Sequence, residues 1–329
     1  MVRLTLCPLD PEQRRGHPLR LRRLLPVLVG VLALAVASTA CADQPTPAAD
    51  GAAETVGLQV FAAASLTAAF QEIGDTFAVD HPEADLAFNF AGSQQLASQI
   101  KEGAQADVFA SANQRQMDGV VAAGDVISGT QRAFARNRLV VVIPPDNPAE
   151  LRGLADLGRP DLKMVLAAKA VPAGSYALAF LGKASAHPDF TPAYSATVMA
   201  NVVSFEDDVV GVLGKVAQGE ADAGIVYLSD VSGPADPKVL RIDIPEALNV
   251  IATYPIAPLA NAQHPDLAQA FVDHVLSPQG QAVLVKHGFM GAVGAAASPV
   301  PDPVAAFGLA GMRPPWPRSP RSAATDVRQ

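Results

Sequence analysis

The sequence predicts an α/β protein with two lobes, each built on a mixed sheet, and three observations lead to this prediction. Strand-like apolar stretches alternate with stretches of helical periodicity over residues 57–289. This region is longer than the roughly 150 residues of an average domain, so two sheets are expected rather than one. The continuous apolar run 138–144 is typical of a strand that helices cover on both faces. In such folds a ligand binds in the cleft, outside the carboxyl ends of the strands.

The first half of this region predicts strand–helix units. The side chains of Leu66, Phe70 and Ile73 recur at helical spacing, whereas "DLAFNF" alternates as a half-buried strand does. The predicted strands are 58–64, 85–90, 106–111 and 138–144, and the predicted helices are 65–78, 93–102 and 113–123.

The second half continues the alternation. Proline and glycine mark the loops, as in "VPAGSY", which turns into a helix. The predicted strands are 163–168, 201–205, 223–230, 239–245 and 249–260, and the predicted helices lie within 171–185, 207–218, 265–276 and 278–287.

Two extended segments, 138–144 and 250–259, are candidates for strands that pass between the lobes. If they do, the lobes are discontinuous in sequence. Lobe 1 then comprises 57–137 and 260–289, and lobe 2 comprises 138–259 with a crossing strand at each end.

Residues 1–41 have the order of a signal peptide, with the basic "RRGHPLRLRR", the apolar "LLPVLVGVLALAVA" and the small residues "STAC". Cys41 stands where a bacterial lipoprotein carries its lipid, although Ser38 replaces the usual leucine three positions earlier. The alternative is ordinary cleavage nearby that leaves a free thiol. Cys7 lies in the removed segment, so the mature chain is expected to have no intramolecular disulfide.

The segments that flank the predicted lobes lack periodicity. Residues 42–56 have the Pro/Ala-rich, polar composition of a flexible tether, which an anchored protein needs in order to clear the membrane surface. The tail 290–329 is rich in Pro, Ala and Gly and contains the only tryptophan, Trp316. We expect this tail to be disordered.

Composition and net charge disfavour some classes of function. Half of the residues are hydrophobic and 17% are charged, which favours a well-buried core. The formal net charge is −8, and the middle of the chain has no Lys/Arg cluster. A nucleic-acid-binding protein needs a basic face, so this class is disfavoured. A small anion stays possible, because neutral donors alone can hold it.

Four strand-to-helix corners share one design: an apolar strand, a loop of small or polar residues, then a helix N-terminus. Unpaired backbone N–H groups and the macrodipole make a helix N-terminus a ready site for an anion. Small neighbouring residues let the backbone come close to a ligand. The corners are "AAASL" with Ser65, "FAGSQQL" with Ser93, "VPAGSY" with Ala173 and Gly174, and "FEDDVVG" with Val209.

Each corner taken alone has a simpler interpretation. Serine is a favoured N-cap and needs no ligand, so Ser65 and Ser93 are each most simply caps. The carboxylates of Asp207 and Asp208 would repel an anion unless they turn away from it. Tyr227 ends an apolar strand, where core packing with a bonded hydroxyl is the default.

Catalytic motifs are absent from the sequence. It has no G-x-S-x-G elbow, H-E-x-x-H pair, P-loop or Rossmann glycine fingerprint. Its histidines lack metal-ligand spacing, and no carboxylates are paired for acid–base work. We therefore expect a secreted binding protein that is not an enzyme and has no cofactor.

Several longer stretches, in the same order along the chain, resemble the molybdate-binding proteins of bacterial ABC importers over nearly all of 57–289. The resemblance implies a type II periplasmic-binding-protein (Venus-flytrap) fold that closes on molybdate or tungstate outside the cytoplasmic membrane and delivers it to a membrane permease. We also expect a monomer, anchored through Cys41. The stretches are "VFAAASLTAAF", "FAGSQQLASQIKEGAQADVFASANQRQMD", "RLVVVIP", "VPAGSYA", "EDDVVGVLGKVAQGEADAGIVYLSD" and "YPIAPLANAQHPDLAQAFVDHVLSPQGQAVLVKHGF".

The resemblance also implies a set of ligand-binding residues. They contact the oxygens of the anion, and the metal only through those oxygens. The set comprises the hydroxyls of Ser65, Ser93 and Tyr227 and the backbone N–H groups of Ala173 and Val209.

Two departures from the family pattern stand near these residues. The second corner usually carries a serine run and here has the sequence "GSQQ", so Gln94 and Gln95 are expected to change the rim of the site. The sequence after the tyrosine is "SDV" instead of the usual "SDA". A sulfate-binding protein of the same fold and an oxyanion sensor without transport stay open as alternatives, and a secreted enzyme has the least support. Sulfate has the charge and shape of molybdate but is smaller, so its exclusion depends on cavity size.

Overall fold

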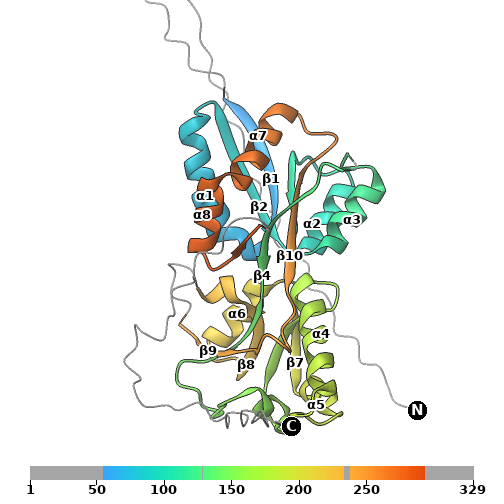
Figure 1. The fold of residues 1–329 in the computed structure, drawn as a ribbon, viewed down its shortest axis with the longest axis vertical. Helices are drawn as coiled ribbons and strands as arrows, with labels where there is room; N and C mark the ends of the chain where they lie inside the picture. Colours follow the sequence, from blue (N-terminus) through green and yellow to red (C-terminus); the bar gives the residue numbers. More distant parts are fainter. Residues whose placement is uncertain (1–54, 128, 233–237, 293–329) are drawn as a thin grey trace, which may run out of the picture. The chain divides into compact units, whose positions relative to one another are not determined.

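Two β-sheets form the framework of the chain in the computed structural model, which describes residues 55–127, 129–232 and 238–292 (Figure 1). The first sheet has the strand order β11-β4-β10-β3-β1-β2, and the second has the order β7-β6-β8-β5-β9. Each contains parallel and antiparallel pairs, so the predicted α/β class with two mixed sheets is confirmed. The predicted signal peptide, Cys41, most of the tether and nearly all of the tail lie outside the described residues.

The first sheet is built around β1, the strand that leads to the first predicted corner. Its carboxyl half is buried on both faces, as the run of apolar residues in "VFAA" requires. It pairs in parallel with β2 and β3, while β10 runs antiparallel to β3 and β4, and β11 antiparallel to β4. The strands are β1 (Val56–Ala63), β2 (Ala84–Ala91), β3 (Val108–Ala110), β4 (Arg132–Asn137), β10 (Ala252–Pro258) and β11 (Met290–Gly291).

The second sheet is built around β5, β6 and β8, whose residues are all buried. β6 lies parallel to β7 and β8, and β5 lies antiparallel to β8 and β9. The strands are β5 (Leu139–Ile143), β6 (Met164–Ala167), β7 (Val202–Glu206), β8 (Ala223–Tyr227) and β9 (Leu240–Asp243).

Helices cover both sheets through their apolar faces. In α1, Phe70 and Phe77 are fully buried and meet the ring of Phe271 of α7 edge-on, at centroid distances of 6.0 and 5.3 Å. Burying one such side chain stabilises the fold by roughly 1.5–3 kcal/mol. The α-helices are α1 (Thr67–Asp80), α2 (Ser93–Lys101), α3 (Gln114–Ala123), α4 (Pro172–Ala186), α5 (Tyr194–Ala200), α6 (Val209–Ala217), α7 (Pro265–Leu276) and α8 (Pro278–Lys286), with 3-10 turns η1 (Ala64–Leu66), η2 (Leu154–Gly158) and η3 (Leu228–Val231).

The strand pairing corrects one part of the prediction. Segment 250–259 was expected to pass between the lobes as the last strand of lobe 2, but β10 pairs only with β3 and β4 of the first sheet. β10 and β4 lie side by side (Figure 1), and the chain passes between the sheets at Arg138 and again between β9 and β10. The prediction was wrong because the sequence does not reveal β4, whose "RAFARN" has no apolar run.

Two smaller elements also depart from expectation. The short helix α5 was not predicted. The tail was expected to lack structure from residue 290, but Met290 and Gly291 form β11, which pairs with Arg136 and Ala135. A strand this short has no periodicity that a sequence could show.

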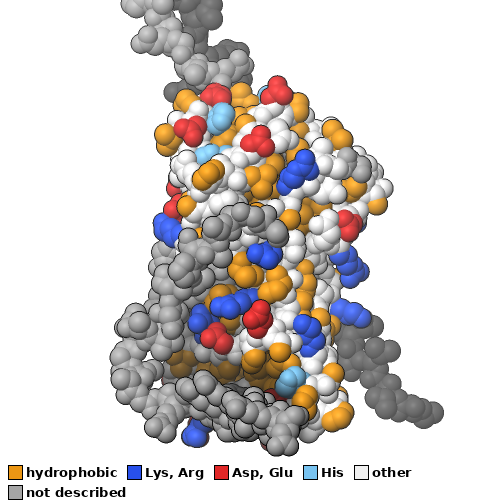
Figure 2. All heavy atoms as spheres, viewed as in Figure 1, with side chains coloured by type: hydrophobic (Ala, Val, Ile, Leu, Met, Phe, Trp, Pro, Cys, Tyr) orange, Lys and Arg blue, Asp and Glu red, His pale blue; other side chains and the backbone are white. Residues whose placement is uncertain are grey.

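The face of the molecule seen in Figure 2 has no large patch of charge of one sign. There, Lys and Arg side chains are interspersed with Asp and Glu. None of the described helices combines the length and the apolar character that crossing a bilayer requires.

Candidate functional site

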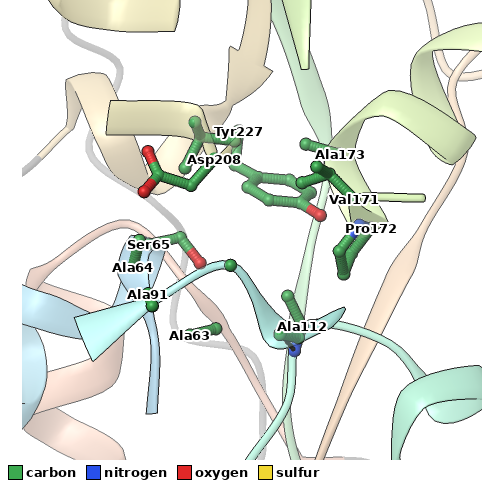
Figure 3. Close-up of a pocket in the computed structure, with 13 residues that line it drawn as sticks. Ala63, Ala64, Ser65, Ala91, Ala112, Val171, Pro172, Ala173, Asp208 and Tyr227 are labelled. Atoms are coloured by element: carbon green, nitrogen blue, oxygen red, sulfur yellow. Dashed lines mark hydrogen bonds between the residues drawn. The ribbon is translucent and has the colours of Figure 1, made fainter. Parts of the chain in front are cut away.

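A pocket lies where strand ends and helix N-termini from the two sheets meet (Figure 3). The space between its walls is about 210 Å³ with open solvent included, and little of that space is enclosed, so the pocket suits only a small ligand. Its lining is small and neutral apart from one carboxylate. The lining residues are Ala63, Ala64, Ser65, Ala91, Gly92, Ser93, Ala112, Val171, Pro172, Ala173, Asp208, Val209 and Tyr227.

The structure brings all five predicted ligand residues to this one pocket. Ser65 and Ser93 follow strands of the first sheet, whereas Ala173, Val209 and Tyr227 come from the second. Four separate corners and one strand end therefore converge, as the common design suggested. That these residues bind an anion stays a prediction.

Ser65 lies inside η1, the single turn that joins β1 to α1. Neither η1 nor α1 has a side-chain capping bond at its N-terminus, so the simple interpretation of Ser65 as an N-cap is wrong. Its Oγ lies 3.0 Å from the hydroxyl of Tyr254 on β10 instead. The extra turn carries Ser65 past the capping position and leaves its side chain on the pocket wall (Figure 3).

Ser93 is the first residue of α2 and is 1% exposed. The N-cap is Gly92, so the capping interpretation of Ser93 is also wrong. Its Oγ accepts a hydrogen bond of 3.0 Å from the backbone N–H of Ala112. Because a protein donor already occupies this oxygen, the hydroxyl hydrogen is left to donate into the pocket.

The third corner depends on a glycine. A Cβ on Gly174 would lie 2.2 and 2.3 Å from the carbonyl oxygens of Ala168 and Ala167, so only glycine lets α4 start this close to the end of β6. Pro172 occupies the first turn of α4, where its missing N–H costs no hydrogen bond. This packing places Ala173, in the first turn of the helix, on the pocket wall.

The fourth corner contains the one charged residue of the lining. Asp208 is the N-cap of α6, and its Oδ1 accepts from the N–H of Gly211 at 3.0 Å. The carboxylate is thus bonded to its own helix, and Val209 starts that helix at the pocket. Asp208 therefore meets the condition that its carboxylate must turn away from an anion.

Tyr227 ends β8 and is 1% exposed. Its hydroxyl is buried and has no hydrogen-bond partner among the described residues, contrary to the default of a bonded core tyrosine. Burial raises the pKa of Tyr227 well above its ordinary value, so the group stays a donor. An unpaired buried hydroxyl costs free energy, which a ligand oxygen in the pocket would recover.

The carboxyl of Asp230 lies just behind this strand end. The N–H of Tyr227 donates to its Oδ2 at 2.8 Å. Burial, aided by the charge of Asp208, raises the pKa of Asp230 to about 7. Near neutral pH this carboxyl is therefore partly protonated, and less negative charge faces an anion than the sequence implies.

Direct hydrogen bonds join the two sides of the pocket at its rim. Gln94 Nε2 donates to the carbonyl of Asp207 at 2.9 Å, and Gln116 Nε2 donates to the carbonyl of Ala170 at 3.2 Å. The departure at Gln94 therefore adds a contact between the lobes. The sequence did not predict the roles of Gln116 and Gly92 at this rim. Only Gly92 had a local signal, because a glycine directly before a helix start indicates a close backbone contact.

The described residues contain no cluster of three or more His, Cys, Asp or Glu side chains that could hold a metal ion. No Lys or Arg lines the pocket, so its donors are hydroxyls and backbone N–H groups. Such a donor set suits an oxyanion, which accepts hydrogen bonds at every oxygen.

Two α/β lobes that meet at a small polar pocket define the class of two-lobed solute-binding proteins. The sequence profile of the family described as "Bacterial extracellular solute-binding protein" matches residues 58–290. The chain belongs to this family, which places it outside the cytoplasm.

Individual relatives of the chain include proteins whose ligands are named. The molybdate-binding protein ModA of Mycobacterium tuberculosis H37Rv is 40% identical over 262 residues, which are 79% of this chain and 95% of ModA. The substrate-binding domain of a putative molybdenum ABC transporter from Clostridium difficile superposes with a TM-score of 0.55 at 29% identity, over 72% of this chain and 99% of that one. The sulfate-binding protein SubI of M. tuberculosis H37Rv has a TM-score of 0.66 at 17% identity, over 77% and 91% of the chains, which is a likeness of fold alone.

Proposed function

We propose that the protein binds molybdate, and also tungstate, outside the cytoplasmic membrane and delivers it to the membrane permease of an ABC importer. One observation carries this proposal: hydroxyls and helix N-termini from four corners converge on a small pocket without a cation. The 40% identity to a molybdate-binding protein over most of the chain supports the choice of anion.

The binding energy would come from fixed neutral donors that replace the hydration shell of the dianion. Each hydrogen bond to a charged acceptor contributes roughly 1.5–3 kcal/mol. The N-termini of α2, α4 and α6 add the positive ends of their macrodipoles. A protonated anion such as hydrogen phosphate would place its own O–H against one of these donors, so it would be rejected.

Transport would follow from closure of the lobes around the anion. The pocket walls belong to both sheets, so bound anion contacts both lobes and favours the state in which they are together. A permease that recognises this state would receive loaded protein in preference to empty protein. In this proposal the protein acts as a monomer, has no resident cofactor and catalyses no reaction.

The main alternative is a sulfate-binding protein of the same fold, and a non-transporting oxyanion sensor is the second. Likeness to a sulfate-binding protein is limited to the fold, at 17% identity. Two relatives of higher identity, ModA of M. tuberculosis at 40% and the Clostridium difficile domain at 29%, bear molybdate or molybdenum in their names. We therefore prefer molybdate.

Isothermal titration calorimetry with molybdate, tungstate, sulfate, phosphate and perchlorate tests the choice of ligand. Molybdate and tungstate are expected to bind at least about tenfold more tightly than the others and to raise the unfolding temperature. Perchlorate, a tetrahedral monoanion, controls for shape without the second charge. Sulfate binding of equal strength, or no response to molybdate, would contradict the proposal.

We further propose that Cys41 carries a lipid that holds the protein at the outer face of the membrane. The proposal rests on the position of Cys41 after an apolar segment and small residues, followed by a tether-like stretch. Cell fractionation is expected to recover the wild-type protein with membranes and the Cys41→Ala variant in the soluble fraction. Equal distribution of the two proteins would exclude this anchor.

A further inference from the structure

Tyr254 is a buried side chain that contacts a predicted ligand residue without lining the pocket. It lies on β10 of the first sheet and is 0% exposed. Its ring meets those of Phe134, Tyr227 and Phe289 edge-on, at centroid distances of 6.3, 5.8 and 5.4 Å. Aromatic neighbours on several sides fix the ring, so the hydroxyl is held in place 3.0 Å from Ser65 Oγ.

Asn137 determines which way the hydrogen bonds of Tyr254 run. It is the last residue of β4 and is 1% exposed. Its Oδ1 accepts from the N–H of Arg138 at 3.0 Å, which fixes the orientation of the amide. Its Nδ2 therefore points away from that bond and donates to Ser229 Oγ at 2.8 Å and to Tyr254 Oη at 3.4 Å.

The Tyr254 hydroxyl thus has its best-placed acceptor in Ser65 Oγ. Its oxygen receives a hydrogen from Asn137, and Ser65 Oγ is the acceptor within hydrogen-bonding geometry among the described residues. Burial and the nearby Tyr254 hydroxyl both raise the pKa of Tyr227, but the Tyr227 hydroxyl forms no hydrogen bond with a described residue, so Ser65 Oγ is the better-placed acceptor for this proton. Burial also raises the pKa of Tyr254, which keeps the hydroxyl protonated.

We propose that Tyr254 is a positioning residue that sets the anion selectivity of the pocket, by donating to Ser65 Oγ and so directing the Ser65 hydrogen toward the ligand. The relay runs from the Asn137 amide through Tyr254 to Ser65. The inference deepens the proposed function and rests on it.

The consequence is a pocket that offers hydrogens from both serines. Ser93 Oγ receives its hydrogen bond from Ala112, and Ser65 Oγ receives one from Tyr254. Each serine then has its own hydrogen to give. A fully deprotonated dianion accepts both, whereas an anion that keeps a proton finds no acceptor in either serine. Without Tyr254, the Ser65 hydroxyl can rotate and accept a proton from the ligand.

Tyr254→Phe removes the hydroxyl and keeps the ring. Calorimetry at about pH 8, where inorganic phosphate is a dianion that still carries one proton, measures the affinities for molybdate and phosphate. The ratio of the two affinities is expected to fall by about tenfold or more relative to wild type. Tyr194→Phe is the matched control, because it removes another buried tyrosine hydroxyl, one that donates to Leu154 O in the second lobe. It is expected to leave the ratio unchanged.

A second variant tests the direction of the relay and serves if Tyr254→Phe does not fold. Asn137→Asp keeps the shape of the side chain, but its carboxylate accepts the Tyr254 hydrogen and reverses the relay. The added charge acts on both dianions, so the same fall in the ratio of affinities is expected. A ratio that stays at the wild-type value in the variants that fold overturns the inference, whether or not both affinities fall together. If wild type itself binds no molybdate, the proposed function fails instead.

Discussion

Gly92→Ala is expected to lower molybdate affinity by about 100-fold or more while leaving the fold intact. A Cβ at this position would lie 2.5 Å from the carbonyl oxygen of Asp207 and 2.4 and 2.6 Å from the amide atoms of Gln94. The carbonyl belongs to the backbone of the opposite lobe and cannot move aside as a side chain can. Gly92 has φ −58° and ψ 133°, which alanine adopts without strain. The clash with the Asp207 carbonyl therefore arises only when the lobes are together, whereas the Gln94 side chain can turn aside. Calorimetry measures the loss of affinity, beside thermal unfolding of the ligand-free protein.

Gly119→Ala provides the control for Gly92→Ala. Gly119 lies in α3, on the same side of the pocket, and a Cβ there meets no atom within 4 Å. Alanine in a helix interior is favoured over glycine by roughly 1 kcal/mol, so this variant should unfold at a slightly higher temperature and bind normally. Unchanged molybdate affinity in Gly92→Ala would mean that binding does not need the close approach of Asp207. Loss of folding in that variant would assign Gly92 to stability instead.

The sequence reveals most of the framework, because its signals are local. Apolar residues at helical spacing mark α1, and the uninterrupted run "RLVVVIP" marks β5. The strand–small-residue–helix design likewise marks the corners that the structure brings to one pocket. β4 is not predicted, because its stability comes from pairing with β10, whose paired residues are 115 to 124 positions away in the sequence, rather than from a periodic pattern of its own.

The parts of the site that the sequence hides are contacts between distant segments. In the sequence, Tyr254 is one residue of an apolar strand, and no local pattern connects its hydroxyl to Ser65 or Asn137. The separation is 189 residues for the first contact and 117 for the second. The prediction that the serines cap their helices was wrong for a different reason. The extra turn η1 moves Ser65 away from the N-cap position, and α2 has Gly92 rather than Ser93 as its N-cap.

Replacing both serines, in Ser65→Ala/Ser93→Ala, is expected to weaken molybdate binding by roughly 10²- to 10⁴-fold. Each hydroxyl would lose one hydrogen bond to a charged oxygen, worth roughly 1.5–3 kcal/mol, and the two serines lie on different elements. Ser93→Ala also leaves the buried N–H of Ala112 without its acceptor, which costs stability. Calorimetry of the two single variants and the double variant, each with its unfolding temperature, separates the two effects.

Ser98→Ala is the control for the serine variants, because Ser98 lies on the same helix as Ser93 but donates to the exposed Glu102. It should bind molybdate as wild type does. The single variants also bear on how the pocket works. Should Ser65 and Ser93 each hold one oxygen independently, their losses in free energy add; should either serine act by letting the lobes meet, the first substitution removes most of the affinity and the second adds little. Wild-type affinity in the double variant would mean that the backbone donors and Tyr227 bind the anion without the serines, and that both serines contribute only to packing.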